Sequence, residues 1–531
     1  MKDMKIIRSI LKSAALLGLA ALCCSGAAAQ ETRLSPAARE FMLKNRFWFN
    51  HTNNAAGSRL DNTAYYSQFD AGFSYGKGDF TRPQAGTSSR DITFSTEGGG
   101  DVGGFYAWGS FDYVNNYTKG TLFNSSSFDP LRGNPYIIAD YRPGDWYKQL
   151  FSLRMNVATP KFWNDRVALG LDIGYTSNTG AKQVDPRPKV DLYEIVIKPG
   201  IVYSVDDDNS LGLSLEYSNL REESDISNNN ITITWEVAFM RGFGYFSSIY
   251  FPGDKRYCRQ NGLGAELQYA YRCDDNIKLI LAGGLKKQTE YTEDNPHYPI
   301  PRGSLNTMKY WAGASAVFGG ARAAHFLNVS YGRVSTDGIE EVYQNQATEN
   351  GASINRIIDK NVRSNYKTTA ITGSYDFFRT AAGEYSWKAG ANVSYLKTDD
   401  IYYVPRSTQA VSSLDMGISG GYNFLRGSAW RLLAEGRFGY NKTLDSKLAL
   451  DVPTPGHAIV TDLVTPDFAY LATDYYRGGI WLTVSREFGK NTGNIYLKAG
   501  YEILKPSTTE STKFSASDSR NIISVKAGCL F

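Results

Sequence analysis

Residues 211–217 read Leu211-Gly-Leu-Ser-Leu-Glu-Tyr217, and their strict alternation decides the fold. Successive side chains of a strand face opposite sides, so the leucines and Tyr217 lie on one face, and Gly212, Ser214 and Glu216 lie on the other. Similar segments of about 9–13 residues, the length of a tilted strand that crosses a bilayer, recur along the chain. Their apolar faces often end in an aromatic residue, as at a membrane interface. The pattern predicts an all-β fold, a transmembrane antiparallel up-and-down β-barrel.

The connections between these segments alternate between short turns and long loops. Bacterial membrane barrels have short periplasmic turns and long extracellular loops, so the alternation predicts an even strand number with both termini in the periplasm. Residues Ile231–Phe239 also resemble a strand, and they predict either a hairpin above the membrane or a count of twenty. The eighteen predicted strands are 65–75, 91–98, 104–116, 150–158, 167–177, 192–205, 210–221, 261–272, 277–289, 305–318, 324–334, 366–378, 385–398, 412–424, 429–441, 472–488, 493–504 and 519–531.

The two ends of the chain carry export features. Basic residues precede an apolar stretch from Ala14 to Leu22, and Ala27–Ala29 offers a cleavage site of small residues. The last strand alternates up to Phe531, and this terminal aromatic residue resembles the outer-membrane assembly signal. We therefore predict a signal peptide at residues 1–29, a periplasmic N-terminal segment at 30–64 and the barrel at 65–531.

The signal, the segment Arg46-Phe-Trp-Phe-Asn-His-Thr-Asn-Asn-Ala-Ala-Gly57 and the barrel through Phe531 together carry a family resemblance. The chain resembles the Bacteroidota outer-membrane β-barrel proteins that are grouped as a family of unknown function. This resemblance implies a barrel in the cell outer membrane and implies no substrate. Asn53–Gly57 is also faintly similar to the element that precedes the first strand of long-chain fatty-acid channels. The alternative for these residues is a polar turn.

The alternation also assigns the charged residues that face the lumen, where the selectivity of a channel is set. Acids outnumber bases among them in the first eight strands, and bases outnumber acids in the other ten. Since strands follow one another around a barrel, one hypothesis is an acidic wall opposite a basic wall, with a transverse field between them. The alternative is local pairing between neighbouring strands. The predicted lumen charges are Asp70, Glu97, Asp112, Asp172, Glu194, Glu216, Glu266, Lys278, Lys286, Lys388, Arg431, Arg437, Lys498 and Lys526.

Two further segments bear on whether the lumen is open. Pro36–Phe49 is mildly amphipathic, which predicts either a short helix that plugs the periplasmic mouth or an unattached tail. Residues 231–239 and 243–251 are unusually apolar for a solvent-exposed loop. Such a loop folds inward to narrow the pore, docks a surface partner, or packs as an ordered hairpin on neighbouring loops.

Several classes of function are disfavoured by the sequence. A net charge of +4 is close to balance and does not require a nucleic-acid partner. The four histidines His51, His297, His325 and His457 show no catalytic spacing, and the sequence contains no metal-ligand cluster, P-loop or dinucleotide motif. We therefore predict no enzymatic activity and no metal or cofactor. The segment 30–64 is also too short for the folded plug domain of a TonB-dependent receptor.

Three functions remain open from the sequence. The first is a porin-like channel for small solutes, and the second is a channel for hydrophobic compounds with Pro36–Gly57 as its hatch. The third is a non-transport accessory or anchor barrel of a surface uptake complex. The predicted partners are outer-membrane lipid and lipopolysaccharide, the barrel-assembly machinery during biogenesis, and a TonB-dependent receptor or surface lipoprotein.

Overall fold

The structure is a computed structural model of the chain. The predicted signal peptide lies outside the described residues. These are residues 34–230, 232–251, 253–273, 276–295, 298–320, 322–347, 353–381, 383–424, 429–488, 493–507 and 514–531.

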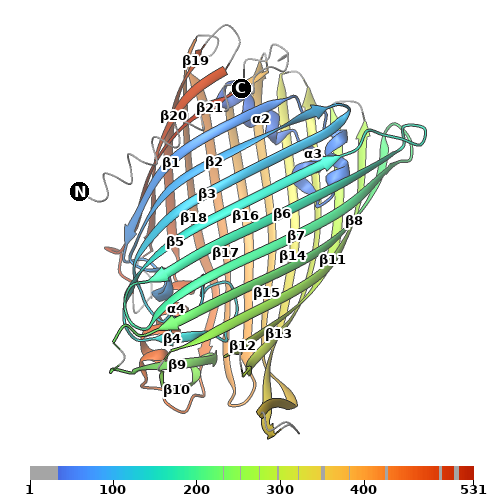
Figure 1. Cartoon of the computed structure of the whole chain (residues 1–531). Coiled ribbons are helices and arrows are strands. Elements are labelled where there is room, and N and C mark those ends of the chain that lie inside the picture. The colour runs from blue at the N-terminus through green and yellow to red at the C-terminus, as the bar shows by residue number, and fades with distance from the viewer. Residues whose placement is uncertain are drawn as a thin grey trace.

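Eighteen antiparallel strands of the described residues form one closed β-barrel (Figure 1). Each strand pairs with the next barrel strand along the chain, and the first also pairs with the last, which closes the barrel. The strands are β1 (Tyr66–Gly78), β2 (Ser88–Val102), β3 (Phe105–Thr121), β5 (Gly144–Ala158), β6 (Val167–Lys182), β7 (Arg187–Ser204), β8 (Asn209–Ser227), β11 (Asp254–Cys273), β12 (Ile277–Asp294), β13 (Ile300–Gly320), β14 (Ala323–Ala347), β15 (Ser353–Ala381), β16 (Glu384–Tyr402), β17 (Ser407–Phe424), β18 (Trp430–Ala449), β19 (Tyr475–Phe488), β20 (Gly493–Pro506) and β21 (Arg520–Leu530).

The predicted count of eighteen is confirmed, and the alternative of twenty is wrong. The strand-like residues of the long loop form the hairpin of β9 (Trp235–Gly242) and β10 (Tyr245–Phe251). This hairpin pairs with the short strand β4 (Ile138–Asp140) in a separate three-stranded sheet, and it adds nothing to the barrel wall. An isolated alternating segment carries no information on which sheet it joins, so the sequence left both counts open.

The outer surface of the barrel is apolar where the strands alternate. Leu211, Leu213 and Leu215 are 49%, 40% and 52% exposed on β8, whereas Ser214 between them is 2% exposed. A large apolar band of this kind is unfavourable in water and is required in a bilayer, and the closed sheet satisfies the backbone hydrogen bonds that lipid cannot. The strands are therefore the membrane-spanning elements. None of the described helices is both long and apolar enough to cross a membrane.

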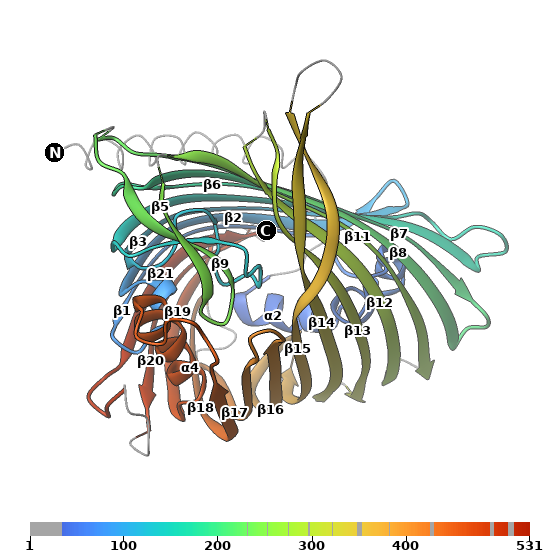
Figure 2. The same cartoon turned by 90° about the horizontal axis from the view of Figure 1, so that it is seen from below.

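The hairpin of β14 and β15 is much longer than predicted and projects beyond the rest of the barrel (Figures 1 and 2). The sequence predicted strands 324–334 and 366–378, which match the thickness of a bilayer. In the structure the pairing continues as far as Ala347 and Ser353. Backbone pairing does not stop where the membrane does, so a length criterion taken from the bilayer underestimates such strands.

The N-terminal segment is helical and lies inside the barrel at the end with the short turns (Figure 1). It contains α2 (Pro36–Lys44), α3 (Phe47–His51) and the 3₁₀ helix η1 (Ala55–Leu60). Helix α2 begins where the sequence suggests, because the Ser35 side chain accepts a hydrogen bond of 3.1 Å from the Ala38 amide and Pro36 occupies the first helical position. We refer to residues 35–61 as the plug.

Three long connections meet over the opposite mouth of the barrel (Figure 2). They are residues 122–143, which contain β4; residues 232–251, which contain β9 and β10; and residues 450–474. The third connection contains the π-helix η3 (Ile459–Val464) and α4 (Thr465–Leu471). All three contribute buried side chains to one apolar cluster that includes Phe123, Met240 and Leu463. We refer to these three connections as the cap.

Candidate functional site

The plug packs against the inner wall on opposite sides of the barrel. Phe47 and Trp48 are each 4% exposed and belong to a cluster with wall residues from β6 to β18. Phe49 and Leu43 pack on the other side, against a cluster that includes Trp108 of β3. The wall residues in these contacts lie at the strand ends next to the short turns, so the plug occupies that mouth of the lumen.

Polar contacts attach the plug to the wall as well. Lys44 Nζ lies 2.6 Å from Asp376 Oδ2 on β15, and Arg46 Nη1 donates to Tyr66 Oη on β1 at 3.0 Å. The first pair is only partly removed from water, since the side chains of Lys44 and Asp376 are 34% and 29% exposed. Partly exposed pairs of this kind contribute about 0–1 kcal/mol each. Two further ion pairs join Arg39 to Glu97 and Glu40 to Lys388.

Asn53 and Asn54 attach the plug to the wall between β7 and β11. Asn53 donates to both oxygens of Glu266, from its backbone amide at 2.8 Å and from its side chain at 2.7 Å. Asn54 Nδ2 donates to the carbonyl of Ile201 at 2.9 Å. The faint similarity of Asn53–Gly57 to fatty-acid channels did not predict these contacts with the wall. In this chain the two asparagines serve as hydrogen-bonding anchors.

Two glycines in the wall make room for the plug. A Cβ atom on Gly170 of β6 would lie 2.0 Å from the backbone nitrogen of Ala56, and one on Gly200 of β7 would lie 2.1 Å from Asn54 Oδ1. Real side chains do not approach this closely, so any other residue at position 170 would displace the backbone of η1, and one at position 200 would displace the Asn54 side chain that anchors it. The docked position of the plug thus depends on these two glycines.

Two titratable groups inside the plug respond to pH in opposite ways. Asp61 accepts hydrogen bonds of 2.9 Å from the amides of Trp48 and Phe49. Burial nevertheless raises the pKa of Asp61 to about 6, from an ordinary value of 3.8. Burial, with a smaller contribution from Lys44, lowers the pKa of His51 to about 4, from an ordinary value of 6.5.

These two pKa shifts change the docked fraction of the plug in opposite directions as the pH rises. The docked plug holds extra protons at Asp61, so this group makes docking weaker as the pH rises from about 4 to 6. His51 is deprotonated when docked, so it makes docking stronger as the pH rises from about 4 to 6.5. We expect D61N to leave a docked fraction that rises with pH, and H51Q one that falls. The mobility of a spin label on the exposed Asn50 position, N50C in a background without native cysteines, measures the docked fraction. Equal slopes in the two variants would contradict this assignment.

The cap is held to the wall by buried ion pairs. Arg132 bridges two carboxylates, with Nη2 at 2.8 Å from Glu222 Oε2 on β8 and 2.7 Å from Glu290 Oε1 on β12. The two carboxylates are 2% and 3% exposed. Lys182 of β6 pairs with Asp140 of β4 in the same region. Residues 122–143 are therefore folded into the barrel mouth and anchored there.

The β9–β10 hairpin reaches from this anchored side to the opposite wall. Phe243 at its turn stacks on Tyr366 of β15, with 5.7 Å between ring centroids. Arg241 Nη1 lies 3.2 Å from Glu340 Oε2 on β14. The structure confirms the ordered hairpin that packs on neighbouring loops, and this hairpin also lies over the mouth of the barrel, whereas docking of a surface partner stays a prediction. The sequence did not indicate that residues 122–143 also fold inward.

Most of the predicted lumen charges have a partner nearby. Asp70 and Lys526 form a pair at 3.5 Å, and Glu216 pairs with Lys286. Glu435 of β18 lies 2.6 Å from both Lys388 and Lys498. The other pairs are Asp172 with Arg154, Arg431 with Glu384 and Glu487, Arg437 with Glu502, and the plug contacts of Glu97 and Glu266.

The pairs between wall residues join neighbouring or next-neighbouring strands, which is the arrangement of the local-pairing alternative. The transverse field across the lumen stays a prediction. For Asp112 and Glu194 the described residues provide no ion pair, and Lys278 lies beside a cavity at the short-turn mouth with Asp61 and Trp48. Within the described part of the chain, no group of His, Cys, Asp and Glu side chains is arranged to hold a metal ion.

Comparison with known proteins gives several similar solved structures. The ferric yersiniabactin uptake receptor FyuA from Yersinia pestis is 9% identical, with a TM-score of 0.40, over 87% of this chain and 80% of that chain. A Pseudomonas aeruginosa FadL homologue is 12% identical, with a TM-score of 0.29, over 90% and 92%. The RagAB peptide transporter is 7% identical, with a TM-score of 0.37, over 87% and 86%.

Among curated proteins, none matches the chain. A family model does match, over residues 55–531, which is most of the length of the chain and includes η1 and the whole barrel. The chain therefore belongs to the family of unknown function DUF6850.

Proposed function

We propose that this protein is a gated channel for small polar solutes in the bacterial outer membrane, with both termini in the periplasm. The observation that carries the proposal is that, among the described residues, the plug of residues 35–61 occupies the short-turn mouth of the lumen. A barrel of eighteen strands is wide enough for a water-filled passage when its interior is not filled by other parts of the chain. The plug is then the gate on the periplasmic side.

The ion pairs of the plug support a gate over a permanent filler. The ion pairs of Arg39, Lys44 and Glu40 are partly exposed, so water replaces them at small cost when the plug leaves. Beyond the apolar wall residues that Phe47 and Trp48 cover, the lumen wall carries ion pairs such as those of Glu216 and Glu435, and this part suits hydrated solutes better than hydrophobic ones.

Several finer points stay predictions within this proposal. A channel needs no enzymatic activity, so the prediction that the protein is not an enzyme forms part of the same proposal. A TonB-dependent receptor or surface lipoprotein as a partner, and an accessory barrel that transports nothing, also stay predictions. Conductance separates the channel from the accessory barrel, because the latter conducts nothing after its plug is displaced.

The test displaces the plug without removing it. In G170V the new side chain overlaps the backbone of Ala56, which costs about 1–3 kcal/mol as overpacking. The ratio of undocked to docked plug then rises roughly 5- to 150-fold, and the open probability in planar bilayers rises with it.

The matched control for this test is G174V. Gly174 lies further along the same face of β6, and a Cβ there would meet Val196 Cβ at an ordinary 3.9 Å. We expect its open probability to equal that of the wild type. If G170V and G174V conduct alike, the plug does not gate the lumen, and the proposal fails.

A further inference from the structure

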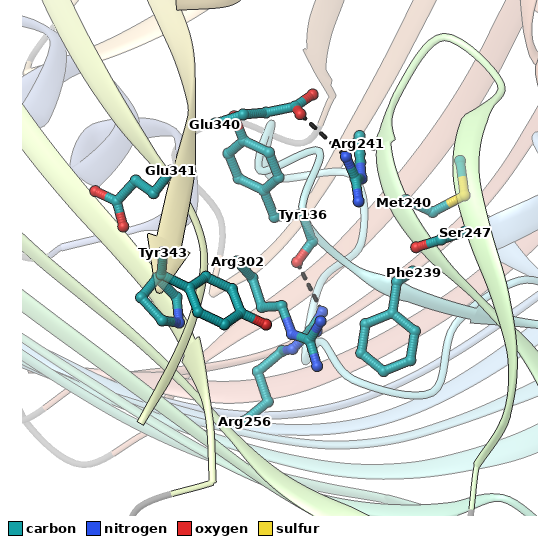
Figure 3. Close-up of a pocket in the computed structure, with 11 residues that line it drawn as sticks. Tyr136, Phe239, Met240, Arg241, Ser247, Arg256, Arg302, Glu340, Glu341 and Tyr343 are labelled. Carbon is teal, nitrogen blue, oxygen red and sulfur yellow. Dashed lines mark hydrogen bonds and ion pairs between the residues drawn. The ribbon is translucent and has the colours of Figure 1, made fainter. Parts of the chain in front are cut away.

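A small cavity lies between the cap and the barrel wall at the long-loop end (Figure 3). Phe239, Arg241 and Ser247 line it from the β9–β10 hairpin, and Arg256 and Arg302 line it from β11 and β13. Its volume is about 110 Å³. That is the liquid volume of about four water molecules, enough for a small polyatomic ion or the head group of a larger solute.

The carboxylates that line the cavity already have donors. Glu340 accepts hydrogen bonds from Arg241 and from the hydroxyl of Tyr402. Glu341 Oε1 lies 2.9 Å from Lys360 Nζ and accepts a hydrogen bond from Ser304 Oγ at 3.3 Å. Both carboxylates that line the cavity therefore already have hydrogen-bond donors within the protein.

The guanidinium groups have donors to spare. Arg302 gives only its Nε to Asp294, at 2.5 Å, and its terminal nitrogens meet no hydrogen-bond acceptor among the described residues. Arg241 has a single carboxylate contact at 3.2 Å, and its side chain is 43% exposed. By contrast, Arg256 is fully engaged, with both oxygens of Asp294 and the carbonyl of Tyr136.

The charges around the cavity leave a positive excess. Four cationic side chains contact three carboxylates, and the carboxylate of Asp294 is shared between two arginines. Phe239 holds those two arginines in place, since the guanidinium carbons lie 4.5 Å and 5.1 Å from the centre of its ring. A site with spare donors, satisfied acceptors and a net positive charge suits an oxyanion. The groups concerned are Arg241, Arg256, Arg302 and Lys360 against Asp294, Glu340 and Glu341.

We propose that this cavity is an oxyanion-binding site, which takes the carboxylate or phosphate group of a small solute between Arg302 and Arg241. The planar guanidinium group presents paired donors that match such oxygens, and charge assistance makes these hydrogen bonds strong. Because Arg241 lies on the hairpin and Arg302 on the wall, the anion links cap to barrel and competes with Glu340 for Arg241. The site lies at the other end of the barrel from the plug, so the binding test and the test of the gated channel can fail independently of each other.

Binding is measured by calorimetry on the full chain in detergent at constant ionic strength, with potassium phosphate and potassium acetate as probes and potassium chloride as the reference. We expect one saturable site for at least one of the two oxyanions. The anion that binds identifies the ligand group as phosphate or carboxylate. Absence of saturable binding for both overturns the proposal.

Substitutions in the cavity test where the anion binds, and a conservative variant separates loss of the site from misfolding. R302Q and R241Q are each expected to raise the dissociation constant about tenfold or more, because each removes charge-assisted hydrogen bonds. R302K keeps the positive charge but loses the paired donors of the guanidinium group. Its dissociation constant should therefore lie between those of R302Q and the wild type. The control is R356Q, which removes an exposed arginine on the same projecting hairpin as Glu340. Unchanged binding in both variants at position 302, or an equal loss in R356Q, would overturn the assignment.

Discussion

A chain that lacks both closures, residues 36–60 of the plug and residues 235–251 of the cap hairpin, is expected to conduct roughly tenfold or more above the wild type in planar bilayers. The two closures lie at opposite mouths of one lumen, so their electrical resistances add in series. Removing either one alone leaves the other as the limiting resistance, and each single deletion should raise the conductance less than the double deletion. The hairpin is replaceable by a short Gly-Ser linker, because Ile226 and Asp254 at its two ends are paired in the barrel.

The control for these deletions removes residues 344–357, the outer part of the projecting β14–β15 hairpin. This part belongs to neither closure, and its loss should leave the conductance unchanged. Heat-modifiable migration on a gel verifies that each barrel is folded. If the double deletion conducts no better than the wild type, side chains of the wall or the remaining cap connections, residues 122–143 and 450–474, fill the lumen. The accessory barrel would then be the better interpretation.

The alternation in the sequence was sufficient for the barrel, because a polar lumen on one face and lipid on the other impose a strict period of two. Leu211–Tyr217 shows this most clearly, and its apolar set is the exposed set in the structure. The same argument assigns a face to each lumen charge but cannot assign a partner. Glu435 contacts Lys388 and Lys498, each two strands away, because side chains converge toward the axis inside a barrel.

The closures were harder to find from the sequence for a physical reason. Asn124–Ser127 is polar and resembles a solvent-exposed loop, yet these four residues are buried. Their burial depends on contacts with residues far along the chain, such as Ser127 Oγ with Glu222 Oε1 at 3.0 Å. The plug shows the same limit, since Ser35-Pro36 predicts the start of α2, whereas the room that Gly170 and Gly200 leave for Ala56 and Asn54 appears only in the folded barrel. Local patterns report local structure, and docking sites are set by shape between distant segments.

Replacing Arg132 with methionine is expected to release the cap from the wall. The variant leaves Glu222 and Glu290 buried without their shared cation, and loss of one partner of a buried pair costs about 3–5 kcal/mol. Loss of an exposed pair costs about 0–1 kcal/mol, so R259M, which breaks the exposed pair with Glu293, is the matched control. Hydrogen exchange of the amides in residues 122–143 measures the effect, and these amides should exchange much faster in R132M than in R259M.

The triple variant R132M/E222Q/E290Q separates the two causes of that loss. If the penalty comes from carboxylates stranded in a dry environment, neutral amides at positions 222 and 290 should restore most of the protection, because no charge then remains buried. The side-chain carbonyl that E222Q introduces can still accept the hydrogen bond that the Phe128 amide now gives to Glu222 at 2.6 Å. If the triple variant exchanges as fast as R132M, the bridge made by Arg132 itself holds the cap in the mouth. Protection in R132M equal to that in R259M would show instead that the apolar cluster of Phe123, Met240 and Leu463 is sufficient to hold it.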